Sequence, residues 1–192
     1  NKLVPLEPED VTEAEVLRGA GYATGLVGKW GLGEPESPGL PTKQGFDEFF
    51  GYLNQKHAHT YYTTYLWRNE DKVSLDGNVE SAPNVATARE QYSHDLFTAE
   101  ALDFVERKKG GPFFLYLAYT IPHANNERGR ALGDGMEVPS YAPYESEDWP
   151  VPMKGHAAMI TRLDRDVGRL LDKLKALGLA EDTIVFFTSD NG

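Results

Sequence analysis

The chain contains no cysteine, which excludes disulfide bonds, thiolate metal sites and a cysteine nucleophile within its 192 residues. Basic residues are also scarce, since 19 Lys and Arg stand against 30 Asp and Glu, for a formal net charge of −11. This charge repels a phosphate backbone, so no nucleic-acid partner is expected. The sequence also has no apolar run long enough to cross a bilayer, and we expect no membrane span.

The amino-terminal residues 1–5, NKLVP, lack methionine and lack the basic and apolar regions of a signal peptide. We interpret this start as an internal cut in a longer protein. With 40% hydrophobic and 11% aromatic residues, the chain can still form a sizeable core. Its length suits one domain or a large piece of one.

Three segments have the features of helices. Thr12 and Glu15 form a capping box in front of a short apolar face. Ser93 is a candidate N-cap for a second helix. Residues 160–177 repeat apolar side chains at helical spacing, and Gly178 ends this third helix.

Three short apolar runs are typical of strands buried in a parallel sheet. They are residues 22–27, 113–119 and 184–187. Residues 34–84 are expected to be irregular, with a hairpin around residues 61–75, and residues 121–154 are expected to form a long loop. Because helix and strand alternate three times, we predict the α/β class with a mainly parallel sheet flanked by helices.

Polar residues follow each of the three predicted strands. Lys29 follows the first, His123 the second, and Asp190 and Asn191 the third. Carboxyl ends of parallel strands meet at the edge of the sheet where ligands bind, so we expect these side chains to lie close together. The oxygens of Asp190 and Asn191 suit a hard cation such as calcium.

A lysine, a histidine and a cation at one edge suit an anionic ester. The cation and Lys29 would offset the charge of the anion, and His123 could pass a proton to a leaving oxygen. Each residue also has a simpler explanation, because Asp-Asn-Gly is a common turn sequence, lysines are mostly solvated, and His123 follows a proline in a turn.

Several segments, in order, resemble the sulfatase family. Residues 21–30 (GYATGLVGKW) resemble its second signature, and residues 43–47 (KQGFD) resemble the segment that follows it. Residues 113–123 and the terminal residues 190–192 resemble later sulfatase blocks. Residues 52–59 (YLNQKHAH) are most similar to bacterial arylsulfatases. The resemblance implies an alkaline-phosphatase-like α/β fold, incomplete in this chain, and hydrolysis of sulfate esters.

The resemblance also implies roles for the site residues. Lys29 would contact the sulfate and the nucleophile, and His123 would bind a sulfate oxygen and assist departure of the alcohol. Asp190 and Asn191 would ligate the divalent ion, usually Ca²⁺ in this family. Many sulfatases place a histidine two residues after the signature lysine, where this chain has Gly31.

We hypothesise that His57 or His59 occupies the space of the missing histidine, because both are near the site loops in sequence. The alternative is that residues 56–62 form a packed polar loop without a chemical role.

The family's nucleophile is a hydrated formylglycine, made from a Cys/Ser-x-Pro/Ala-x-Arg motif that this chain lacks. The aspartate pair that completes the metal site and a later substrate-facing lysine are also missing. We therefore expect residues 1–192 to be the central part of a single sulfatase catalytic domain, truncated at both ends, with the formylglycine elsewhere in the parent. By itself this chain should bind calcium weakly and hydrolyse no sulfate ester.

Two alternative functions remain open at this stage. One is a non-catalytic binding domain of sulfatase ancestry, and the other is a phosphodiesterase or phosphonate hydrolase of the same superfamily. The expected partner is a small-molecule or carbohydrate sulfate ester. Four aromatic residues could line a platform for its alcohol half or could simply pack in the core. They are Tyr61, Tyr62, Tyr65 and Trp67. Family resemblance suggests a periplasmic or secreted parent.

Overall fold

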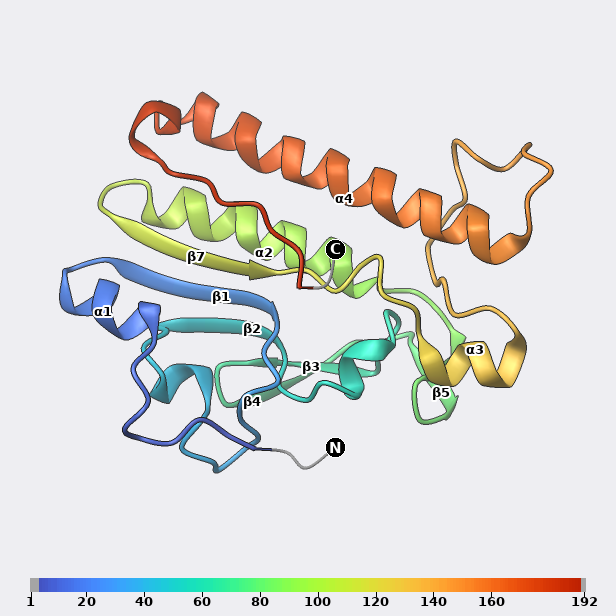
Figure 1. Cartoon of the computed structure of the whole chain (residues 1–192), viewed down its shortest axis with the longest axis horizontal. Helices are drawn as coiled ribbons and strands as arrows, with labels where there is room; N and C mark the ends of the chain where they lie inside the picture. Colours follow the sequence, from blue (N-terminus) through green and yellow to red (C-terminus); the bar gives the residue numbers. More distant parts are fainter. Residues whose placement is uncertain (1–3, 191–192) are drawn as a thin grey trace.

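A five-stranded mixed sheet forms the centre of the computed structural model, which describes residues 4–190 (Figure 1). Its strand order is β4-β3-β2-β1-β7. The strands are β1 (Ala23–Lys29), β2 (Glu48–Tyr52), β3 (Tyr65–Arg68), β4 (Asp71–Ser74) and β7 (Phe113–Ala118). β1 runs parallel to β2 and to β7, whereas β2 with β3 and β3 with β4 are antiparallel. A separate hairpin consists of β5 (Val79–Ala82) and β6 (Val85–Ala88).

The helices are α1 (Glu13–Gly19), α2 (Ser93–Lys108), α3 (Asn126–Leu132) and α4 (Val151–Ala176), with 3₁₀ turns η1 (Pro41–Lys43), η2 (His57–His59) and η3 (Ala180–Asp182). α1 and α2 cover opposite faces of the sheet, whereas α3 packs against β6 and α4 against α2. Successive side chains of a strand point to opposite faces. Leu26 therefore packs with Ala14 of α1, and its neighbour Val27 packs with Phe97 of α2. The predicted α/β class, with parallel strands at the centre of the sheet, is confirmed.

α4 lies alongside α2, on the side of α2 away from the sheet (Figure 1). The two helices share a buried polar contact, in which the His94 Nε2 atom lies 3.0 Å from Asp166 Oδ2. Arg165 and Arg169 also bind the Asp166 carboxylate. Burial lowers the pKa of His94 despite its acidic partner. No helix in residues 4–190 combines the length and the apolarity needed to span a bilayer.

The capping box that the sequence predicts is present at the start of α1. Thr12 Oγ1 accepts a hydrogen bond from the Glu15 backbone N–H at 3.2 Å, and Glu15 Oε2 accepts one from the Thr12 N–H at 2.9 Å. The prediction that Ser93 caps α2 is wrong. Ser93 is the first helical residue, Tyr92 occupies the N-cap position, and no side chain caps the helix there.

Part of the region expected to be irregular forms strands. The predicted hairpin is present as β3 and β4. Neither β2, which pairs with β1, nor the β5–β6 hairpin is predicted by the sequence. Local composition did not predict β2 because its partner strand β1 lies elsewhere in the chain.

The third predicted helix is longer than expected. α4 begins at Val151 rather than near Ile160, and α3 lies inside the segment expected to be a loop. The apolar stripe of α4 is only partly buried, since Leu174 is buried but Ile160 is 47% exposed. The early turns were missed because they carry few apolar residues at helical spacing.

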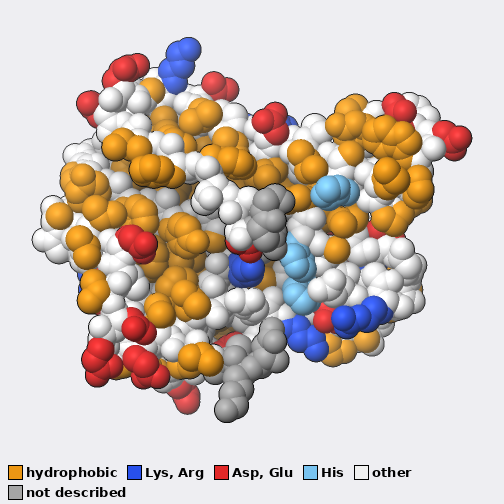
Figure 2. Space-filling model, viewed as in Figure 1, with side chains coloured by type: hydrophobic (Ala, Val, Ile, Leu, Met, Phe, Trp, Pro, Cys, Tyr) orange, Lys and Arg blue, Asp and Glu red, His pale blue; other side chains and the backbone are white. Residues whose placement is uncertain are grey.

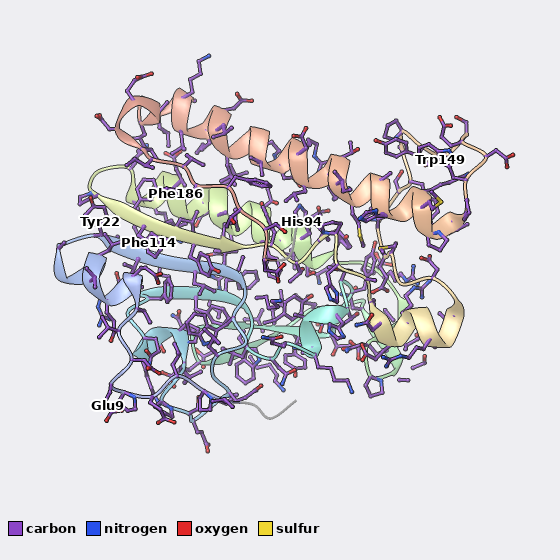
Figure 3. All side chains as sticks on the ribbon, in the orientation of Figure 1. Glu9, Tyr22, His94, Phe114, Trp149 and Phe186 are labelled. Atoms are coloured by element: carbon purple, nitrogen blue, oxygen red, sulfur yellow. The ribbon has the colours of Figure 1, made fainter. Side chains whose placement is uncertain are left out.

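The prediction of a last strand at residues 184–187 is wrong. This segment is extended but belongs to no strand, and Phe186 is 89% exposed (Figure 3). An apolar run becomes a strand only where a neighbouring strand supplies hydrogen bonds. Within residues 4–190, β7 pairs on one side only, with β1. Figure 2 shows apolar side chains spread widely over this face of the molecule.

The carboxyl ends of β1 and β7 approach each other so closely that only glycine fits at position 28. Gly28 has a φ of +117°, and a Cβ atom there would lie 2.0 Å from the Ala118 carbonyl oxygen. Side chains larger than hydrogen would therefore force the two strands apart.

We predict that Gly28→Ala lowers the free energy of unfolding by roughly 2 to 4 kcal/mol, through backbone strain and overpacking. Gly168→Ala is the matched control, because a Cβ atom at this α4 position would meet nothing within 4 Å. The control should gain roughly 0.5 to 1 kcal/mol from better helix propensity. Urea denaturation measures both, and equal stability of the two variants would contradict the strand-spacing argument.

Candidate functional site

Four predicted site residues belong to segments that leave the sheet at one edge. Lys29 is the last residue of β1 and pairs in register with Tyr52, the last residue of β2. The next pair along β1 joins Gly28 to Ala118, the last residue of β7. His57 and His59 follow β2, and His123 follows β7. Figure 2 shows a basic side chain beside histidines near the middle of one face.

The most distinctive contact at this edge joins two histidines. The rings of His59 and His123 are stacked, with centroids 5.2 Å apart and planes 19° apart. His59 Nδ1 lies 2.8 Å from Glu127 Oε2, in the first turn of α3. His123 is exposed, so one ring of the pair is open to solvent.

A buried tyrosine ties the two histidine segments together. The Tyr61 hydroxyl lies within hydrogen-bond reach of the carbonyl oxygens of Thr120 and His123, both in the turn after β7. Because Tyr61 is two residues after His59, its side chain fixes the segment of one histidine against the segment of the other.

The buried carboxylate of Glu137 also stabilises this region. Glu137 Oε2 accepts a hydrogen bond from Asn125 Nδ2 at 2.7 Å, and Glu137 Oε1 lies 3.7 Å from Arg128 Nε. Burial raises the pKa of Glu137, opposed by the hydrogen bonds from Asn125 and the Tyr61 backbone and by the nearby arginines. Asn125 also caps α3 by accepting from the Arg128 backbone N–H. The carboxylate therefore stabilises the loop that carries His123.

His57 has a different environment from His59. Its ring stacks on Tyr65 with centroids 4.3 Å apart, and its Nε2 atom lies 2.6 Å from Thr63 Oγ1. Burial, with a smaller contribution from the charge of Lys72, lowers its pKa to about 4. His57 is therefore neutral at pH 7 and packed among aromatic residues.

The backbone requires glycine at position 31, where many sulfatases have histidine. Gly31 has a φ of +83°, and a Cβ atom there would lie 2.5 Å from Gln55 Cγ. A histidine would need a different backbone and a displaced Gln55. The departure from the family pattern is thus built into the local structure.

A cavity of about 580 Å³ lies beside His57 and Tyr65, which both line it. Residues after β1 and β2 and from the β5–β6 hairpin line it, among them Glu34, Asn54, Lys56 and Asn84. Asn84 Nδ2 lies 3.2 Å from Glu127 Oε2, which connects the wall of the cavity to His59. A smaller hollow at the opposite end of β2 is lined by ion-paired Glu48 and Arg107 and lies away from this edge.

The predicted metal ligands are not brought together with other ligands in the described residues. Asp190 is exposed in a bend, and Asn191 lies outside the described residues. Residues 4–190 contain no group of three or more His, Asp or Glu side chains that could hold a metal ion. The residues present therefore do not by themselves fit a calcium site.

Two of the four aromatic residues considered as a substrate platform are core residues. Tyr61 and Tyr62 are 0% and 4% exposed and belong to a buried cluster. Tyr65 and Trp67 are partly buried beneath the Lys72 ammonium, which lies 4.0 Å from the Tyr65 ring centroid.

Sequence reasoning missed Glu127, Asn125 and Glu137. Asn125 carried a signal, because asparagine is a favoured N-cap. Glu127 carried none, since it is 68 residues from its partner His59. Glu137 lies in the segment expected to be a long loop, yet it is 1% exposed.

We predict that His57 takes up a proton only near pH 4 in the folded protein, whereas the unfolded chain would do so near its ordinary pKa of 6.5. Stability from the neutral ring is fully present above pH 6.5 and falls as the pH drops toward 4, because the unfolded state then binds more protons. NMR titration of the ring measures this pKa. Tyr65→Ala removes the stacked ring and should move the midpoint upward; a wild-type midpoint near 6.5 would refute the burial argument.

Comparison with known proteins identifies the family. The sulfatase family model matches residues 5–192. The chain is 34% identical over 187 residues to N-acetylgalactosamine-6-sulfatase of Sus scrofa, covering 93% of this chain and 32% of that protein. It is 30% identical over 203 residues to an arylsulfatase of Hemicentrotus pulcherrimus, covering 97% and 32%.

Solved structures agree on the fold. The crystal structure of Ps i-CgsB in complex with k-i-k-neocarrahexaose is similar with a TM-score of 0.71 at 24% identity, over 93% of this chain and 39% of that one. The chain spans about a third of the length of its curated relatives. The match over residues 5–192 shows that the chain belongs to the sulfatase family.

Proposed function

We propose that the whole protein hydrolyses sulfate esters and that residues 1–192 form the central part of its single catalytic domain. One observation carries this proposal: Lys29 and the stacked pair of His59 and His123 belong to segments that follow the carboxyl ends of three parallel strands, in a chain of the sulfatase family. Ligands of open α/β sheets bind at that edge.

The proposed roles follow from the charges of these groups. The Lys29 ammonium would bind the anionic sulfate, and His123 would bind a sulfate oxygen and donate a proton to the departing alcohol oxygen. Of the two candidates for the missing histidine, we favour His59, because it contacts His123 whereas His57 is stacked on Tyr65.

The proposed substrate is a carbohydrate or small-molecule sulfate ester. The cavity lined by His57 and Asn84, about 580 Å³, offers space and polar side chains for the alcohol half, and Asn84 connects it to His59 through Glu127. A relative with 34% identity is named for an amino-sugar sulfate, which favours a sugar.

We predict that Lys29→Met and His123→Asn each lower kcat/KM of the whole protein for a sulfate ester by about a hundredfold or more, since each removes charge or proton transfer. His59→Ala should also slow turnover, and His57→Ala should act mainly on stability. Steady-state kinetics on nitrophenyl sulfate, corrected for folded fraction, measure these effects.

Distinct outcomes would overturn this function. Unchanged turnover after replacement of both His57 and His59 would remove them from the site. Faster hydrolysis of a matched phosphate ester would assign the protein to phosphodiester or phosphonate chemistry. Binding of sulfated ligands without turnover by the whole protein would favour a non-catalytic domain.

We propose Ca²⁺ as the divalent ion of the whole protein, with Asp190 and Asn191 as two of its ligands and the formylglycine outside residues 1–192. Two protein ligands fall far short of the six to eight oxygens that calcium prefers. Calorimetry on the 192-residue chain should therefore detect only weak calcium binding, with no sulfate-ester turnover. Tight stoichiometric binding would contradict this assignment.

A further inference from the structure

We propose that Glu127 is a positioning residue that holds the His59 ring in one orientation and one tautomer against His123. This proposal rests on the proposed function only for its catalytic meaning. The contact itself is defined by residues at the carboxyl edge of the sheet.

The start of α3 aims Glu127 at His59. Asn125 caps the helix by accepting from the Arg128 backbone N–H at 3.0 Å, which fixes the first turn where Glu127 lies. Asn125 is itself fully buried and donates to the Asn84 carbonyl oxygen at 2.8 Å. The helix start is therefore anchored to the β5–β6 hairpin.

One carboxylate oxygen of Glu127 contacts two hydrogen-bonding side chains. Glu127 Oε2 lies 2.8 Å from His59 Nδ1 and 3.2 Å from Asn84 Nδ2. Asn84 also donates to the Lys56 carbonyl oxygen at 2.7 Å, three residues before His59. The carboxylate thus contacts the ring directly and, through Asn84, the segment that carries the ring.

Glu127 remains an acceptor at neutral pH. Burial acts to raise its pKa, but the hydrogen bonds from His59 and Asn84 outweigh burial and hold the pKa below its usual value. An ionised carboxylate has no proton to give, so the neutral His59 ring must carry its proton on Nδ1. The Nε2 lone pair is then free to accept a proton or a hydrogen bond.

Ring ¹⁵N chemical shifts of His59 test the assignment without any enzymatic assay. At a pH above the usual titration range of histidine, wild type should show the Nδ1–H tautomer. Glu127→Ala should lose this preference, whereas Glu127→Gln keeps an acceptor oxygen and should largely retain it. Glu145→Ala, at an exposed loop carboxylate that accepts from Ser140, is the matched control and should leave the His59 shifts unchanged.

An Nε2–H tautomer in the wild type, or the same tautomer in wild type and Glu127→Ala, overturns the proposal whatever the protein hydrolyses. In the whole protein, Glu127→Ala should lower kcat for sulfate esters by about ten- to a hundredfold with little change in KM, as expected for a residue that orients a functional histidine. A shifted tautomer with unchanged kcat overturns the catalytic role of Glu127. If the wild-type protein does not hydrolyse sulfate esters, the proposed function is overturned instead. The NMR measurement of the His59 tautomer can still be interpreted in that case.

Discussion

The parallel pairing of β1 with β2 on one side and β7 on the other is the constraint on which the site depends. It sends three chain segments out of the sheet at the same edge, so residues far apart in sequence become neighbours. The close approach of Gly28 to the Ala118 carbonyl sets the spacing of two of these strand ends. Lys29 follows directly, and its position is therefore determined by backbone packing rather than by contacts of its own side chain.

Outside the sheet, hydrogen bonds of buried polar side chains hold the loops in place. Glu137, Asn125 and Tyr61 are all buried, and each joins two segments that regular secondary structure does not connect. A loop rich in proline and acid would otherwise have little to hold it. Buried polar groups of this kind stabilise a structure only when their partners are in place, which makes the loop around His123 a cooperative unit.

Local signals predicted the elements that carry their own determinants. The capping box at Thr12, the apolar run of β7 and the hairpin of β3 and β4 all appear as expected. Features that depend on distant partners were not predictable: β2 needs β1, and the contact of His59 with Glu127 spans 68 residues. Residues 184–187 show that a local signal alone is not enough. Their sequence is typical of a strand, but they pair with no neighbouring strand in the described part of the chain.

The Tyr61 phenol has a dynamic consequence. Because it bonds to the turn that carries His123 while lying two residues from His59, a displacement of either imidazole segment is transmitted to the other. The backbone segments that carry the two stacked rings should therefore move together when the surrounding loops shift. A ligand entering at this edge would meet two imidazoles whose main chains keep a fixed relation to each other.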